Sequence, residues 1–292
     1  MFQGTLPAIV TPFVESSSLN PPVDYESLES LIEWQLKHKI DGIVVVGSTG
    51  EAATLSTEEK LSVIKRTVEI VNKRVPVIAG TGSNNTYDSL ELTIKVKSLG
   101  VDGVLLVAPY YNKPTQEGLF QHFKIIAEKG NLPVVIYNIP GRSVVEISIP
   151  TIEKLCSVPN IVAIKQAVDS ASKLIELAAV VGEKMAILAG DDPLIYSVMS
   201  VGGKGVISAS ATAFPGVIAE ITEAALNNQM KASFDAQLRA MPYINAIFAE
   251  TNPIPAKAAL KLQGIIKSDK MRLPLTSAND NTYAILKNLI NK

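Results

Sequence analysis

The chain has 292 residues, enough for two ordinary domains or for one large α/β barrel. Hydrophobic residues make up 47% and charged residues 19% of the chain, a composition that excludes a disordered protein. With 27 Lys and Arg against 28 Asp and Glu, the chain lacks the basic excess of nucleic-acid-binding and polybasic membrane proteins. We therefore expect its partners to be small molecules and other subunits.

Cysteine and histidine are too scarce for a cysteine-based or histidine-rich metal site. The single cysteine, Cys156, allows no internal disulfide, and the two histidines, His38 and His122, are too few for a histidine-rich site. No apolar run approaches the roughly 18 residues of a membrane span. The first lysine or arginine is Lys37, so the N-terminus does not resemble a signal peptide. We expect a cytoplasmic protein with no metal and no membrane segment.

Eight short segments rich in β-branched residues recur along most of the chain. Their hydrophobicity is continuous instead of alternating, which is typical of parallel strands that bury both faces. They span residues 5–11, 42–47, 76–82, 103–109, 133–140, 161–167, 186–191 and 205–210.

Segments of helical periodicity separate these strands. Asp24 can cap the first helix, and Ser56 with Glu59 forms a capping box before the second. Eight alternating units predict an α/β fold of the (β/α)8 or TIM-barrel class over residues 1–224, with a doubly wound open sheet as the weaker alternative. Further helices fit residues 86–98, 115–129, 170–181 and 215–227.

Helices alone follow the eighth unit. They fit residues 229–249, 253–264 and 279–291, and no Gly/Ser-rich linker precedes them. We therefore expect residues 225–292 to form a C-terminal helical domain that packs on the barrel.

One lysine stands at a position suited to catalysis. Active sites of barrels lie at the carboxyl ends of the strands, and Lys165 is the only lysine within an apolar strand segment. Burial penalises the ammonium form, so a lysine in the barrel interior has a lowered pKa and a neutral amine that can attack a carbonyl carbon. A buried ion pair with Asp191 or Asp192 is the competing interpretation. Tyr137, on the preceding strand, suits either proton transfer or simple packing.

Two other features indicate binding of carboxylates. Residues 47–50, Gly-Ser-Thr-Gly, can curl into a nest of backbone N–H groups around an anion, although an ordinary tight turn has the same composition. Arg142 is the only arginine in a loop at a catalytic strand end, where its planar guanidinium suits a carboxylate; a surface role is the alternative. Residues 80–85 lack the third glycine of a dinucleotide motif, so we expect no such cofactor.

The strand ends together carry the motifs of a known family. The motifs are Gly47-Ser48-Thr49-Gly50-Glu51, Pro109-Tyr110-Tyr111-Asn112-Lys113-Pro114, Tyr137-Asn138-Ile139-Pro140-Gly141-Arg142, Lys165, Gly190-Asp191-Asp192 and Asn252-Pro253-Ile254-Pro255. From Gly4 to Leu275 the chain resembles the dihydrodipicolinate synthases, which are barrels of the N-acetylneuraminate lyase superfamily.

This resemblance implies a lyase of lysine and diaminopimelate biosynthesis. Such an enzyme condenses pyruvate with L-aspartate 4-semialdehyde as a homotetramer, and it needs no cofactor because pyruvate is bound covalently as a Schiff base. The resemblance implies that Lys165 is the nucleophile, and that Tyr111 crosses a tight dimer interface. It assigns the proton relay to Thr49, Tyr111 and Tyr137, and substrate binding to Ser48, Thr49, Arg142, Gly190 and Ile207, with Arg142 as the clamp for the semialdehyde carboxylate.

Two positions depart from the family pattern. Ser48 stands where the synthases more often carry threonine, and Gln166 stands where they usually carry glutamate. Serine at position 48 also occurs in sialic acid lyases, but those enzymes lack an arginine that matches Arg142. A pyruvate-dependent lyase acting on a sugar acid, like N-acetylneuraminate lyase, stays open as the alternative activity. A barrel that has lost catalysis and only binds a ligand is the third hypothesis.

The resemblance also indicates a regulatory site. In sensitive family members L-lysine binds between subunits, at positions that correspond here to Asn84, Asp88 and Tyr110. Thr57 and Lys60 stand where sensitive enzymes usually have histidines. Because a cationic Lys60 would repel the ammonium group of bound lysine, our hypothesis is weak or absent inhibition.

Overall fold

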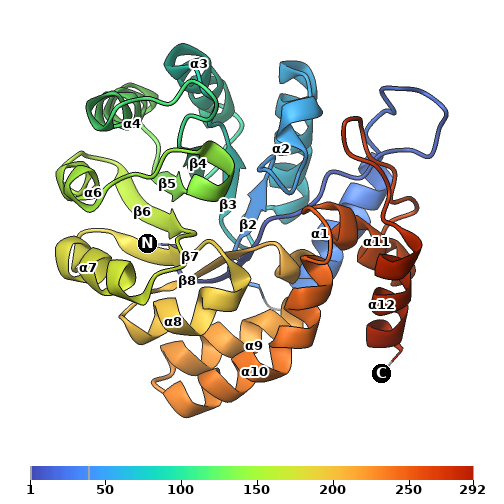
Figure 1. Cartoon of the computed structure of the whole chain (residues 1–292). Coiled ribbons are helices and arrows are strands. Elements are labelled where there is room, and N and C mark those ends of the chain that lie inside the picture. The colour runs from blue at the N-terminus through green and yellow to red at the C-terminus, as the bar shows by residue number, and fades with distance from the viewer. Residues whose placement is uncertain (1, 39, 292) are drawn as a thin grey trace.

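Eight parallel strands form a barrel in the computed structural model, which describes residues 2–38 and 40–291 (Figure 1). The strands follow one another in the order β1-β8-β7-β6-β5-β4-β3-β2, and a bridge between Ala8 and Val44 brings β1 beside β2. The predicted TIM barrel is confirmed, and the doubly wound alternative is wrong. The strands are β1 (Gly4–Pro7), β2 (Ile43–Val45), β3 (Val77–Gly80), β4 (Gly103–Val107), β5 (Val134–Asn138), β6 (Ile161–Gln166), β7 (Ala186–Ala189) and β8 (Gly205–Ser208).

Helices surround the strands, as Figure 1 shows. Both predicted caps are present: Asp24 accepts a hydrogen bond from the Ser27 N–H, and Ser56 and Glu59 form the reciprocal capping box. The sequence patterns did not indicate α5 (Pro140–Ser143), α6 (Ile149–Leu155) or α8 (Ile195–Ser200), which are too short for a clear periodicity. The other barrel helices are α1 (Tyr25–Lys37), α2 (Thr57–Val71), α3 (Thr86–Lys97), α4 (Gln116–Gly130), α7 (Ala171–Val181) and α9 (Pro215–Leu226), with the 3-10 turns η1 (Ala52–Thr54), η2 (Asp192–Leu194) and η3 (Ser210–Thr212).

The strands bury both of their faces. Alternate side chains, such as Val135 and Tyr137 of β5, point into the barrel interior and form one apolar cluster there. Their neighbours, such as Val134 and Ile136, pack against the surrounding helices in a second and larger cluster. This double burial explains why the strand segments read as continuous apolar runs.

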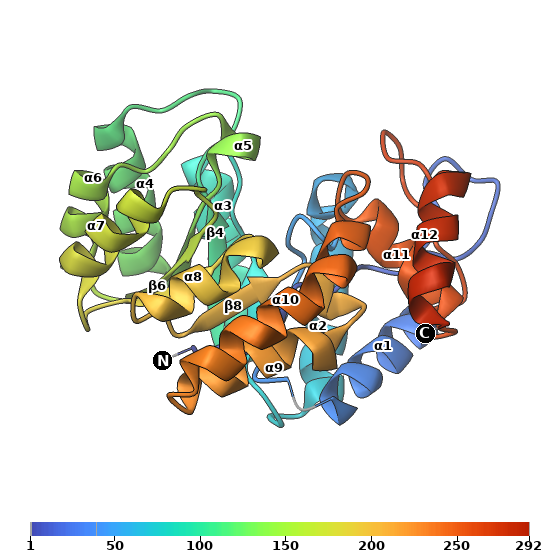
Figure 2. The same cartoon turned by 60° about the horizontal axis from the view of Figure 1, so that its bottom comes forward.

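The C-terminal helices lie along one side of the barrel (Figure 2). They are α10 (Met230–Ile247), α11 (Ile254–Leu262) and α12 (Asp280–Ile290). Helix α10 packs on α8 and α9, and α12 packs on α10 and α11. Within the described residues, no helix is both long and apolar enough to cross a membrane.

A buried ion pair connects α11 to the loop that follows β2. The Nζ of Lys257 lies 2.5 Å from a carboxylate oxygen of Glu51, and both side chains are almost wholly shielded from solvent. The same Nζ donates to the Lys270 carbonyl oxygen at 2.8 Å and lies 4.0 Å from the centre of the Phe13 ring. Removal of either charge would leave the other without its partner in the protein interior.

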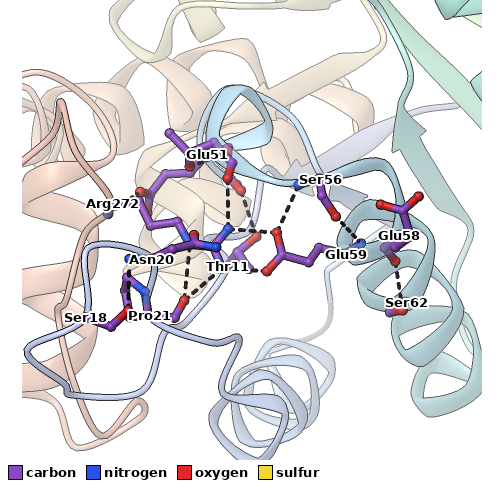
Figure 3. A network of polar contacts seen from close by, with 12 residues as sticks. Thr11, Ser18, Asn20, Pro21, Glu51, Ser56, Glu58, Glu59, Ser62 and Arg272 are labelled. Atoms are coloured by element: carbon purple, nitrogen blue, oxygen red, sulfur yellow. Dashed lines mark hydrogen bonds and ion pairs between the residues drawn. The ribbon is translucent and has the colours of Figure 1, made fainter.

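Arg272 makes a second link between the C-terminal segment and the barrel (Figure 3). Its guanidinium donates to both carboxylate oxygens of Glu59, at 2.8 and 2.6 Å, and to the Thr54 carbonyl oxygen at 2.8 Å. Its backbone N–H donates to Glu51 at 3.3 Å. The segment from α11 to Arg272 is therefore tied to both ends of the connection between β2 and α2.

We predict that Lys257→Met lowers the free energy of unfolding by about 3–5 kcal/mol, because it leaves the Glu51 carboxylate buried without its partner. Urea denaturation measures the change. The double variant Lys257→Met/Glu51→Gln should recover most of the loss. The matched control is Lys231→Met, which breaks an exposed pair with Asp235 and should cost less than about 1 kcal/mol. Equal losses for the two single variants would contradict a structural role for the buried pair.

Candidate active site

A cavity of about 340 Å³ opens at the carboxyl ends of the strands. It brings together most of the side chains singled out in the sequence. A neighbouring cavity of about 450 Å³ shares Tyr137, Arg142 and Asn252 with it, so the two form a continuous candidate site. The predicted residues that line the first cavity are Ser48, Thr49, Tyr137, Arg142, Lys165 and Gly190.

Lys165 and Tyr137 lie side by side on β6 and β5. They occupy the same register position, and the Nζ of Lys165 lies 4.1 Å from the centre of the Tyr137 ring. The ion pairs among the described residues do not include Lys165, which removes the main support for a buried ion pair. Gly190, directly after the neighbouring strand β7, leaves room for the lysine, since a Cβ there would lie 2.9 Å from the Lys165 Cγ.

The surroundings favour the neutral form of Lys165. The lysine is 6% exposed, and this burial lowers its pKa to about 8, an effect that Asp192 opposes and Arg142 strengthens. Asp192 accepts a hydrogen bond from the Ser210 N–H at 2.7 Å, and burial raises the pKa of its carboxyl group. Burial also raises the pKa of Tyr137 well above its usual range, so the phenol keeps its proton. An uncharged amine and a protonated phenol therefore stand together above about pH 8, and about a tenth of the amine is already uncharged at pH 7.

The turn after β2 presents Ser48 and Thr49 to the cavity. Val46 adopts a left-handed backbone conformation with φ 57°, which is uncommon for a β-branched residue. The turn fits only because position 80 is glycine, as a Cβ there would lie 2.1 Å from the Val46 carbonyl oxygen. The Glu51 N–H closes the turn on the Ser48 carbonyl oxygen at 3.1 Å.

Asn252 connects two of the predicted site residues. Its side-chain Nδ2 donates to the Thr49 Oγ1 at 2.9 Å, and its backbone carbonyl oxygen accepts from Arg142 at 3.2 Å. Arg142 comes from α5, directly after β5, whereas Asn252 lies between α10 and α11. The sequence indicated Asn252 only as part of a family motif. Its one local feature is the Asn-Pro pair just before a helix outside the barrel, which does not predict a place in the site.

Two predicted residues lie apart from the cavity. Ile207 of β8 belongs to the apolar cluster inside the barrel. Tyr111 is 88% exposed and has a left-handed backbone with φ 73°, so a single chain does not bring it to Lys165.

Gln166, one of the two departures from the family pattern, accepts a hydrogen bond from Asn138 at 3.1 Å and is buried within the wall of the barrel.

Three of the proposed regulatory residues lie in or beside the larger cavity. Lys60 and Tyr110 line the cavity of about 450 Å³, and Asn84 donates to the Tyr110 carbonyl oxygen at 3.2 Å. Burial lowers the pKa of Lys60. Asp88 is exposed in the first turn of α3. A role for these residues in binding L-lysine stays a prediction.

Comparison with known proteins agrees with this geometry. The model of the dihydrodipicolinate synthetase family matches residues 1–292. The chain belongs to this family. A 4-hydroxy-tetrahydrodipicolinate synthase of Geobacter metallireducens is 47% identical over 275 residues, which cover 94% of this chain and 93% of the relative. A protein of the same name from Clostridium novyi is 41% identical over 290 residues, or 99% and 96% of the two chains.

Solved structures of the family superimpose closely. The dihydrodipicolinate synthase from Aquifex aeolicus has a TM-score of 0.95 and 40% identity, with 99% of this chain and 97% of that chain covered. The chloride-inhibited enzyme from Acinetobacter baumannii, complexed with pyruvate, has a TM-score of 0.95 and 42% identity over 100% and 98% of the chains. The resemblance noted in the sequence is thereby confirmed for the family.

The lowered pKa of Lys165 predicts a distinctive pH dependence. The kcat/KM for pyruvate should rise about tenfold per pH unit below pH 8 and level off above it, because the amine must be neutral to attack. Steady-state kinetics between about pH 6 and pH 10 measure the profile. A value that still rises about tenfold from pH 9 to pH 10 would indicate an ordinary lysine and contradict the effect of burial.

Proposed function

We propose that this protein is a 4-hydroxy-tetrahydrodipicolinate synthase, which condenses pyruvate with L-aspartate 4-semialdehyde through a Schiff base on Lys165. One observation carries the proposal: a buried lysine, outside every described ion pair, faces a cavity lined by Tyr137 and Arg142. The names of the relatives at 41–47% identity support the reaction. The pyruvate bound in the Acinetobacter baumannii enzyme supports the first substrate.

The reaction begins when the neutral Lys165 amine adds to the carbonyl carbon of pyruvate. The carbonyl oxygen leaves as water, and an imine forms. Loss of a methyl proton converts the imine to an enamine, whose carbon attacks the aldehyde carbon of the semialdehyde and leaves a hydroxyl group. The amino group of the semialdehyde then displaces the lysine amine and closes the ring. One water is released overall, and the chemistry needs no cofactor.

Thr49 and Tyr137 are the groups we assign to proton transfer. Both line the cavity that contains Lys165, and the protonated phenol of Tyr137 is a donor at the pH of the reaction. The N–H groups of the turn at Ser48 and Thr49 suit the carboxylate of pyruvate. Arg142, on the same cavity, suits the carboxylate of the semialdehyde.

We assign Tyr111 to the active site of a neighbouring subunit in a homotetramer. Its exposure supports this assignment, because Tyr110 and Tyr87 are exposed as well, and exposed aromatic side chains that gather on one surface are typical of protein interfaces. Tyr87, also exposed, lies on α3 at the same end of the molecule as the motif loop of residues 109–114, which Asn84 contacts. The assembly would complete the relay that the single chain leaves open.

An N-acetylneuraminate lyase-like activity is the competing reaction. A guanidinium at Arg142 suits a small substrate with its own carboxylate, which the semialdehyde has and N-acetylmannosamine lacks. Product formation from pyruvate with each of these two aldehydes tests the choice directly. Faster turnover with N-acetylmannosamine would overturn the proposal.

We predict that Arg142→Ala lowers kcat/KM for the semialdehyde about tenfold to a hundredfold, mainly through KM, because a charge-assisted contact of about 1.5–3 kcal/mol is lost. Reductive trapping of pyruvate by borohydride should persist, since imine formation does not need the second substrate. Arg239→Ala is the matched control, as Arg239 forms only an exposed pair with Glu220. Unchanged kinetics in Arg142→Ala would assign this residue to the surface.

A further inference from the structure

The loop that carries Arg142 leaves the barrel after β5 and returns to it at Ile147. Within this loop α5 is a single helical turn, which is too short to be stable by itself. Val144, which ends the turn, is 63% exposed and has a left-handed backbone with φ 66°, an unfavourable conformation for a β-branched residue. Contacts outside the turn must therefore hold the loop in this conformation.

Asn138, the last residue of β5, closes the base of this loop. Its Oδ1 accepts a hydrogen bond from the Ile147 N–H at 2.9 Å, and its Nδ2 donates to the Ile147 carbonyl oxygen at 3.4 Å. Both residues are buried. One side chain therefore binds both backbone groups of the residue at which the loop returns to the barrel.

Gln166 fixes the orientation of the Asn138 amide. A backbone N–H can only donate, so the Ile147 N–H requires the oxygen of the Asn138 amide and leaves its nitrogen to find an acceptor elsewhere. The Oε1 of Gln166 accepts from this nitrogen at 3.1 Å, from the paired position on β6. Both side chains are shielded from solvent, so loss of this bond would leave a buried polar atom with a poorer partner.

The position of the Arg142 guanidinium depends on this loop. Within residues 2–38 and 40–291, its only hydrogen-bond partner is the carbonyl oxygen of Asn252, at 3.2 Å. The backbone N–H of Arg142 donates to the Ile139 carbonyl oxygen at 3.0 Å, and the Ser143 Oγ donates to the same oxygen at 2.9 Å. Because these last two contacts lie within the loop, the contacts of Asn138 place the whole turn relative to β5.

We propose that Asn138, oriented by Gln166, is a positioning residue that holds Arg142 where it binds the carboxylate of the second substrate. Neither Asn138 nor Gln166 lines either cavity, so both act through the loop and not on the substrates. This inference rests on the proposed function, in which Arg142 binds the semialdehyde. It assigns binding of the second substrate to a buried amide pair between β5 and β6 that imine formation does not use.

The test is Asn138→Ala, which removes both contacts to Ile147 and the contact to Gln166. The kcat/KM for the semialdehyde should fall about tenfold, mainly through KM, because Arg142 is no longer held at the cavity. The rate of borohydride trapping with pyruvate should stay within about twofold, since imine formation does not use Arg142. A fall in trapping as large as the fall in kcat/KM would contradict the proposal and indicate a general defect of the barrel.

A double-variant cycle identifies the group through which Asn138 acts. In an Arg142→Ala background no guanidinium is left to position, so Asn138→Ala should cause no further fall in kcat/KM for the semialdehyde. A full additional fall in that background would overturn the proposal. Native kinetics in a folded Asn138→Ala variant would overturn it as well.

Variants of Gln166 test the orientation of the amide, and they replace the first test if Asn138→Ala does not fold. Gln166→Glu keeps an acceptor for the Asn138 Nδ2 and should leave the KM for the semialdehyde within about twofold. Gln166→Met removes that acceptor at similar length and should raise the same KM about threefold or more. Equal KM values in the two folded variants would contradict the role of Gln166.

Hydrogen exchange gives a readout that does not depend on the reaction. Residues 139–148 should exchange faster in Asn138→Ala than in the native protein, because the Ile147 N–H loses its acceptor. Equal exchange would overturn the proposal even if the protein acted on a different aldehyde. If the native protein formed no pyruvate adduct, the Schiff-base chemistry would be refuted, whereas the exchange result would still decide the role of Asn138.

Gln35→Ala is the matched control for loss of a buried amide. The Gln35 side chain is wholly buried and donates to the carbonyl oxygens of Ala211 and Thr212, but it lines neither cavity. The variant should lower Tm without changing the KM for the semialdehyde or the exchange of residues 139–148. A rise in that KM equal to the rise in Asn138→Ala would show that general destabilisation is sufficient, and would overturn the proposal.

Discussion

The burial of an unpaired lysine in the barrel interior is the constraint on which the candidate site depends. Two lysines of the described residues are buried deeply enough for their pKa to fall to about 8, so desolvation alone does not separate them. Lys257 is paired with Glu51 and donates to a carbonyl oxygen, which occupies its amine in the structure. Lys165 faces a cavity instead, and Gly190 keeps its side chain unobstructed. Geometry therefore identifies the lysine that is free to react.

The C-terminal segment completes the site that the barrel begins. The strands place Lys165 and Tyr137 at adjacent positions, but the contacts to Thr49 and Arg142 come from Asn252. The buried network of Lys257 and Arg272 holds this segment against the turn after β2. We infer that stability and catalysis are linked at this turn, because the residue that closes it, Glu51, also receives the buried charge.

The barrel could be predicted from the sequence because the patterns that indicate its strands and helices are local. Continuous apolar segments mark strands that bury both faces, and the caps at Asp24 and Ser56 lie within three residues of the groups they bind. The position of Lys165 within such a strand was equally visible. The ion pair of Lys257 and Glu51 could not be predicted, since it joins residues far apart in the chain and Lys257 stands in an unremarkable helical segment. The contacts of Tyr111 could not be predicted, because its proposed partner is another subunit and the sequence of one chain does not indicate how two subunits pack.

Mass spectrometry of the protein reduced with borohydride in the presence of pyruvate tests the central claim most directly. The account predicts one covalent adduct, on the tryptic peptide that spans residues 155–173, because a modified Lys165 resists cleavage. The adduct should require pyruvate and should be absent from Lys165→Ala. An adduct on Lys257 or on any other lysine, or no adduct at all, would contradict the assignment of Lys165 as the nucleophile.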